Sequence, residues 1–138
     1  RGGGAMLHLW AALAEFVAQE RIDTLFGVAS FHGTNPSAFA QPLSLLHHRH
    51  LAPEPVRVRA IGKTAQRLDV VPEAELDRLA AVRAMPALIK SYLRLGATVG
   101  AGAFVDHAFQ TTDVCIILQR DAVGEMQKAI LAKGLQLG

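Results

Sequence analysis

Cysteine is almost absent from this sequence of 138 residues, because Cys115 is the only one. A chain with one cysteine cannot form an internal disulfide framework, which excludes the small disulfide-stabilised folds of secreted domains. Cys115 lies in the apolar run 114–118, where a lone cysteine usually packs as a small hydrophobic side chain. We therefore expect a reducing, cytoplasmic environment and a thiol that takes no part in catalysis.

Long apolar runs and an excess of one charge are also missing. No stretch approaches the roughly 18 consecutive apolar residues of a membrane-spanning helix. The 14 Lys and Arg against 12 Asp and Glu give a net charge of +2, so the charge balance does not favour nucleic-acid binding. The apolar stretch 5–18 contains His8 and Glu15, and we interpret it as a helix rather than a signal peptide.

Hydrophobic residues make up 51% of the sequence, which is enough for one folded domain over residues 1–138. Apolar spacing and helix-start signals predict helices over 5–19, 35–48, 72–84, 86–95 and 123–133. Apolar or alternating runs predict strands over 24–31, 56–60, 97–105 and 113–118, with a loop over 62–69. The expected fold class is α/β (α+β), a mixed sheet flanked by helices.

Three stretches together resemble the ornithine N-acyltransferases, a hemolysin-like family of ornithine-lipid biosynthesis in the GNAT-like superfamily. They are RGGGAM with the helix through Trp10, FGVASFHGTNP with PLSLLHHRHLAP, and MPALIKSYLRLGATVGAGAFVDHAFQTTDVCIIL at residues 85–118. The third is the most specific, because its long ordered pattern is not a general signature of a fold. The resemblance implies a GNAT-like sheet, of which this chain is the C-terminal portion without the N-terminal strands.

The resemblance also implies a reaction. A (3-hydroxy)fatty acyl group would move from acyl carrier protein to the α-amine of ornithine, giving lyso-ornithine lipid. Acyl carrier protein or acyl-CoA would act as a co-substrate, so we expect no bound cofactor. The expected partners are the carrier protein and ornithine, while peripheral contact with the inner membrane and a homodimer stay open.

In that superfamily a loop before a helix holds the pyrophosphate of the donor, and the matching residues here are Arg1, Gly2, Gly3, Gly4 and Ala5. Backbone N–H groups at a helix N-terminus favour anions, and glycines allow a phosphate to approach closely. Both coenzyme A and a carrier protein present a phosphopantetheine arm that such a loop could bind. On spacing alone, a flexible leader without a ligand is an equally good interpretation.

Candidate residues for the acceptor follow the ends of two predicted strands. Ser30, His32 and Gly33 end the first strand, where ligand sites of α/β sheets often lie, and we assign substrate binding to them. Asp106 and His107 occupy a loop before the last strand and are our catalytic candidates. The carboxylate could bind the acceptor's ammonium, and the imidazole could help to deprotonate it. Solvated turn residues are the alternative interpretation for both groups.

Two clusters of basic residues allow a functional and a simpler interpretation. His47, His48 and His50 have no carboxylate or thiolate nearby at ligand spacing, so we expect no metal site. Lys90 and Arg94 are helical neighbours that could contact an acidic carrier protein or anionic lipid headgroups. A solvated helix face is the alternative for this pair.

Two other functions fit parts of the pattern. One is a non-catalytic fragment or remnant of the same fold, which would act by self-association or partner binding through an unpaired sheet edge. The other is a CoA-dependent acetyltransferase of a small amine. The upstream coding sequence would separate the first alternative from the enzyme, and the masses of products from mixed acyl donors would separate the second.

Overall fold

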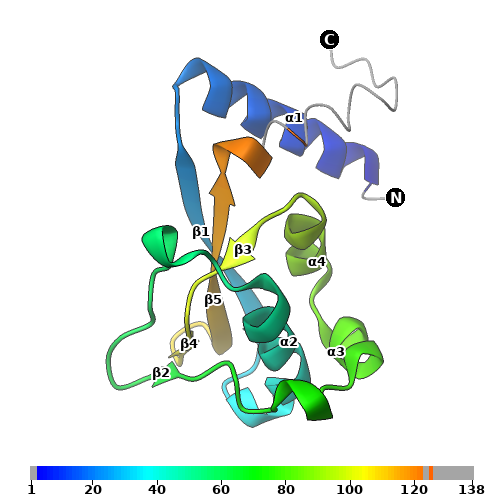
Figure 1. Ribbon diagram of the computed structural model, residues 1–138, viewed down its shortest axis with the longest axis vertical. Coiled ribbons are helices and arrows are strands. Elements are labelled where there is room, and N and C mark those ends of the chain that lie inside the picture. Colours follow the sequence, from blue (N-terminus) through cyan, green and yellow to red (C-terminus); the bar gives the residue numbers. More distant parts are fainter. Residues whose placement is uncertain (1–2, 123–124, 126–138) are drawn as a thin grey trace. The chain divides into compact units, whose positions relative to one another are not determined.

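The computed structural model describes residues 3–122 and residue 125. Its helices are α1 (Gly3–Gln19), α2 (Ala40–His50), α3 (Arg78–Ala84) and α4 (Ala87–Arg94), with short 3₁₀ turns at Pro36–Phe39, Glu54–Val56 and Glu73–Glu75. Its strands are β1 (Thr24–His32), β2 (Ala65–Gln66), β3 (Thr98–Val99), β4 (Ala103–Asp106) and β5 (Thr111–Gln119) (Figure 1). The expected mixed α/β class is confirmed.

Two compact units make up the described chain. Residues Phe26–Ile117 form one unit, and the described residues up to Leu25 and from Leu118 onward form the other. In the second unit, the side chain of Arg120 forms an ion pair with Asp23 and donates a hydrogen bond to the carbonyl of Ile22. The candidate acceptor residues all belong to the first unit.

The strands that the structure describes form one five-stranded sheet in the order β1-β5-β4-β2, and β3 also pairs with β5. The pairs β2–β4, β3–β5 and β4–β5 are antiparallel. β1 and β5 run antiparallel as well, because Ser30 bonds to Asp113 while Gly33, further along β1, bonds to the earlier residue Gln110. β5 therefore lies in the middle of the sheet.

One face of the sheet is closed and the other is open. On β1, Ala29 and Phe31 are buried, whereas Phe26 and Val28 are 54% and 69% exposed. Because successive strand residues point to opposite faces, this alternation separates a core face from an exposed one. The helices complete the core with buried apolar side chains, among them Leu43, Leu46, Ala81, Met85 and Ile89.

The helix expected over 35–48 is divided into a 3₁₀ turn and α2. Asn35 accepts a hydrogen bond from the backbone N–H of Ser37 and so begins the turn. Pro42 lies in the first turn of α2, where backbone N–H groups have no partner within the helix. The proline therefore breaks no helical hydrogen bond at this position.

The strand expected over 97–105 is interrupted at residues 100–102, which separates β3 from β4. Gly102 has a φ of +84°, and a Cβ at Gly100 would lie 2.8 Å from Val58 Cγ2. The predicted strand at 56–60 is reduced to a 3₁₀ turn and a bridge between Arg59 and Ala101. Residues 56–60 and 100–102 thus approach each other closely, and neither segment forms a regular strand at this point.

Other differences are local. The loop expected over 62–69 contains the short strand β2. The helix expected over 72–84 is a 3₁₀ turn followed by α3, which begins after Asp77 because the carboxylate of Asp77 accepts a hydrogen bond from Ala80 N–H at 3.1 Å. Apart from Glu125, the helix expected over 123–133 lies outside the described residues.

Candidate functional site

The two groups of predicted acceptor residues meet at one end of the sheet. Gly33 N–H donates a hydrogen bond to the carbonyl of Gln110 at 2.9 Å, and Thr112 Oγ1 donates to the carbonyl of Gly33 at 2.8 Å. These bonds fix the end of β1 against the β4–β5 turn, which contains His107 and follows Asp106. Segments that are more than 70 residues apart in sequence are thereby brought together.

The pairing register places four polar side chains on the open face. Ser30 Oγ donates a hydrogen bond to Asp113 Oδ1 at 2.6 Å, so these two side chains share a face. His32, two residues along β1, lies on the same face as Ser30. Asp113 is opposite Phe104, and two residues after Phe104 comes Asp106. His32 and Asp106 flank β5, about two strand spacings or ~10 Å apart.

Asp106 and His107 differ in their surroundings. Asp106 Oδ1 accepts a hydrogen bond from the backbone N–H of Phe109 at 3.0 Å, which caps the turn and leaves Oδ2 without a bond in the described structure. His107 is exposed on the turn, and its carbonyl accepts a hydrogen bond from Gln110 Nε2 at 2.7 Å. The register therefore assigns Asp106, but not His107, to the open face.

Asp113 was not among the residues predicted from the sequence. It is partly buried, and among the described residues no Lys, Arg or His nitrogen lies within 4.0 Å of its carboxylate. The only sequence signal was a charged residue at the start of an otherwise apolar strand, residues 113–118. Its bond to Ser30 depends on the register of β1 against β5, which the sequence does not reveal.

A cavity of about 190 Å³ lies on the open face beside Asp113. Its walls are mainly apolar and include Val28, Val58, Phe104 and Cys115. The lining also contains Gly100, where a larger residue would not fit. A Cβ at this position would lie 2.8 Å from Val58 Cγ2 and 3.4 Å from Cys115 Cβ. The open face thus combines a polar end with an adjoining apolar hollow.

Cys115 is unsuited to act as a nucleophile. Burial raises the pKa of its thiol, and a hydrogen bond with the backbone of Gly27 opposes this effect only in part. A raised pKa keeps the sulfur protonated near neutral pH, and the thiolate is the reactive form. The cysteine therefore contributes to the wall of the cavity rather than to covalent chemistry.

The predicted donor loop lies in the other compact unit. Arg1 and Gly2 are outside the described residues, whereas Gly3, Gly4 and Ala5 are the first residues of α1. The helix therefore begins two residues earlier than expected. The N–H groups of a first helical turn have no partner within the helix, so their use as a donor site stays a prediction.

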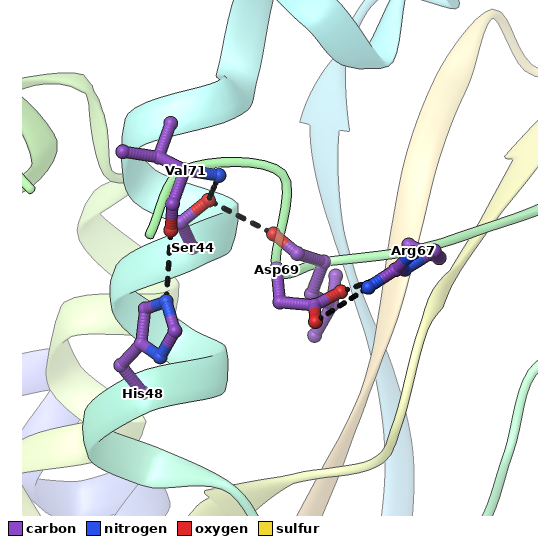
Figure 2. Close-up of polar contacts among 6 residues, drawn as sticks. Ser44, His48, Arg67, Asp69 and Val71 are labelled. Carbon is purple, nitrogen blue, oxygen red and sulfur yellow. Dashed lines mark hydrogen bonds and ion pairs between the residues drawn. The ribbon is translucent and has the colours of Figure 1, made fainter. Parts of the chain in front are cut away.

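The histidines of α2 have structural contacts. His48 Nε2 forms a hydrogen bond of 2.8 Å with the carbonyl of Val71 (Figure 2). The ring of His48 also lies edge-on to that of His47. Burial, Arg78 and Arg49, in that order, lower the pKa of His50. Over the ranges that the structure describes, no three His, Cys, Asp or Glu side chains form a group able to hold a metal ion.

Figure 2 also shows how the loop after β2 is attached to α2. Ser44 Oγ donates a hydrogen bond to the carbonyl of Leu68 at 3.0 Å and accepts one from Val71 N–H at 2.9 Å. In the same loop, Arg67 forms two hydrogen bonds with the carboxylate of Asp69, which lower the pKa of Asp69 and raise that of Arg67. We call Ser44, His48, Leu68 and Val71 the loop clamp.

The part of the chain that the structure describes contains no helix with the length and apolar character needed to cross a membrane.

Known proteins similar to this chain share one description. The chain is 53% identical over 136 residues to an L-ornithine N(alpha)-acyltransferase of Rhodobacter capsulatus, a match that covers 99% of this chain and 52% of the relative. It is homologous to a segment of the L-ornithine N(alpha)-acyltransferases. The resemblance indicated by the three sequence stretches is thus confirmed.

Two further relatives carry the same description. The one from Brucella abortus is 46% identical over 110 residues, which cover 80% of this chain and 39% of the relative. The one from Agrobacterium fabrum is 44% identical over 110 residues, with coverage of 80% and 38%. The chain thus spans about half the length, or less, of the relatives that it matches. No family model and no solved structure matches it.

Proposed function

We propose that this chain is part of an N-acyltransferase that moves a (3-hydroxy)fatty acyl group from acyl carrier protein to the α-amine of ornithine. The product would be lyso-ornithine lipid. The observation that carries the proposal is the 53% identity over 136 residues to a protein named L-ornithine N(alpha)-acyltransferase. The fatty acyl donor and the lipid product follow from the family resemblance of the sequence.

The chemistry requires a deprotonated amine and an oriented thioester. The amine nitrogen attacks the thioester carbonyl, a C–N bond forms, the C–S bond breaks, and the carrier thiol leaves. One proton must leave the ammonium before attack, and a second must leave the nitrogen as the amide forms. Because a thioester is already reactive, correct orientation supplies much of the rate, and no protein nucleophile is needed.

The open face carries groups suited to these steps. His32 is exposed there, and its imidazole is a group that can accept the proton of the amine. Asp106, across β5 on the same face, offers a carboxylate that attracts a cationic acceptor. We therefore give the role of general base to His32 and keep Asp106 and His107 as catalytic candidates. Ser30 and Gly33 shape the acceptor site beside them.

Donor recognition would use other parts of the chain. Lys90 and Arg94 lie on α4, where Lys90 is half-buried and Arg94 is exposed, and their positive charges suit an acidic carrier protein. The first turn of α1, at Gly3, Gly4 and Ala5, suits the phosphate of the phosphopantetheine arm. These assignments concern the donor only, and the proposed chemistry at the acceptor does not depend on them.

The test is an assay of acyl transfer with several donors. The longest continuous reading frame that contains this chain would be purified and mixed with ornithine and 3-hydroxyacyl carrier protein, long-chain acyl-CoA or acetyl-CoA. We expect a long-chain N-acylornithine from the carrier-protein donor, identified by mass spectrometry. Acetylornithine without any long-chain product, or no transfer from any donor, would contradict the proposal. The 138-residue chain assayed alone would show whether this segment is sufficient.

A further inference from the structure

The size of the cavity on the open face restricts what it can hold. Its volume is about 190 Å³. An apolar cavity of about 150 Å³ in another protein accommodates benzene, a ring of six carbons. The cavity therefore matches the side chain of a small amino acid.

The chemistry of the walls restricts the ligand further. Val28, Val58 and Phe104 present aliphatic and aromatic surface, which suits methylene groups. The lining has two charged side chains, the carboxylate of Asp113 and the guanidinium of Arg59, and these two do not form an ion pair. A short alkyl chain that ends in a positive charge would suit the apolar walls and the carboxylate of Asp113.

The carboxylate of Asp113 has a fixed orientation and one oxygen that is available to a cation. The hydroxyl of Ser30 donates to Oδ1 at 2.6 Å and fixes the orientation of the carboxylate, while Oδ2 has no hydrogen-bond donor in the described structure. Within the described ranges no Lys, Arg or His nitrogen lies within 4.0 Å of it. An ammonium from a ligand could therefore donate a charge-assisted hydrogen bond to this carboxylate.

Building on the proposed function, we infer that this cavity binds the aminoalkyl side chain of the acceptor, with Asp113 pairing with its terminal ammonium. The apolar walls hold the methylene groups, and Ser30 acts as a positioning residue for the carboxylate. Asp113 is then the residue that selects a basic amino acid over a neutral one of equal length.

The experiment compares ornithine with norvaline, which has the same carbon skeleton but no terminal amine. The enzyme produced from the longest reading frame is assayed with both acceptors at a fixed donor concentration. We expect the wild-type protein to prefer ornithine, and Asp113→Asn to lower kcat/KM for ornithine by about 10- to 100-fold, as for a charged hydrogen bond. The value for norvaline should not change, and Ser30→Ala should reduce the same preference by a smaller factor.

A matched control removes a carboxylate elsewhere in the same unit. Glu75 is exposed in the 3₁₀ turn Glu73–Glu75, so Glu75→Gln makes the same charge change and should leave both acceptors unaffected. Thermal unfolding of each variant shows whether the fold is retained. An equal loss for ornithine and norvaline in Asp113→Asn, or a wild-type enzyme that does not discriminate between them, would overturn the inference.

Failure of the proposed function has a different signature. If the wild-type protein acylates neither acceptor, the proposed activity is wrong, and calorimetry with free ornithine then tests the cavity alone. Binding that Asp113→Asn abolishes and Glu75→Gln preserves would support the inference. Binding that both variants retain, or no binding at all, would contradict it.

Discussion

Neighbouring histidines on α2 differ because their surroundings differ. His48 is held by the carbonyl of Val71, whereas His50 is partly buried and lies near Arg78 and Arg49. Burial is the largest cause that lowers the pKa of His50, and the two cations add to it. The folded protein therefore favours neutral His50.

This preference predicts how stability depends on pH. The unfolded state binds a proton at His50 near the ordinary pKa of 6.5, and the folded state binds it only at lower pH. Stability should thus be fully present above about pH 6.5 and should decrease as the pH falls through the lowered pKa. Urea unfolding at pH 7.5, 6.5 and 5.5 measures this, and His50→Gln should reduce the loss. His107→Gln, which changes an exposed turn histidine, is the control; an equal effect would contradict the assignment.

His32 should matter for the rate more than for acceptor binding. We expect His32→Gln to lower kcat by about 10²-fold, the lower end of general acid–base contributions, with little change in KM for ornithine. His107→Gln is the informative comparison. If kcat falls in His107→Gln and not in His32→Gln, the general base is His107 in the turn and not His32 on β1.

The sequence predicted individual site residues where they follow the end of a strand. Ser30, His32 and Asp106 were identified in this way, and the structure places all three on one face. Their roles in the reaction stay predictions. Asp113 was not predicted, because its role depends on its contact with Ser30 of β1. The sequence does not reveal which residues of β1 and β5 are opposite each other.

Among the secondary-structure elements, the loop clamp fixes an irregular segment to a regular one. The loop after β2 has few backbone partners of its own, and the hydroxyl of buried Ser44 joins the carbonyl of Leu68 and the N–H of Val71 to α2. This attachment holds Leu68, which is itself fully buried, in the core.

Removal of the clamp hydroxyl should be costly. Ser44→Ala leaves a buried acceptor, the carbonyl of Leu68, and a partly buried donor, the N–H of Val71, without partners. We expect a loss of about 2–3 kcal/mol in the free energy of unfolding. Ser91 provides the control, because its hydroxyl only bonds back to the carbonyl of Ala87 on the surface of α4. Ser91→Ala should change stability by less than about 0.5 kcal/mol in the same urea titration. Equal losses in the two variants would show that Ser44 is not a clamp.

Elements with a clear hydrophobic period were predictable, and those defined by tertiary contact were not. The apolar run at β1 and the stripe of α1 predicted those elements closely. The division of 97–105 into β3 and β4 depends on the approach of Val58 to Gly100, which lies some forty residues further along the chain. The bridge of Arg59 to Ala101 depends on the same contact.

For the molecule as a whole, the main feature is that one face of the sheet is covered and the other, which carries the candidate site, is exposed. Within the unit Phe26–Ile117, the core face is filled by apolar side chains of strands and helices, and the opposite face exposes Phe26, Val28 and Phe104 beside the polar group. An unfilled sheet face with a polar end can accept a substrate without any rearrangement of the core. The sequence alone predicted a sheet flanked by helices but not which face would stay open.

Recognition of a carrier protein would depend on the charge of a whole surface and not on one contact. If the carrier protein approaches α4, the double variant Lys90→Glu with Arg94→Glu should raise KM for the acyl carrier protein by about tenfold or more at low salt, and less at high salt. The KM for a small acyl-pantetheine thioester should not change. Lys63→Glu, on an exposed loop, is the control for a charge reversal elsewhere on the surface. An equal effect on both donors would contradict carrier docking at α4.

The central position of β5 has a consequence for how the sheet opens. β1 pairs with it on one side, and β4 and β3 pair with it on the other, whereas β2 pairs only with β4. Amides at the edge can therefore exchange with deuterium through small local openings, while those of β5 are released only when several strands separate together. Protection factors should be highest along Thr111–Gln119 and lowest at Ala65–Gln66, so that exchange would rank the strands by their number of neighbours.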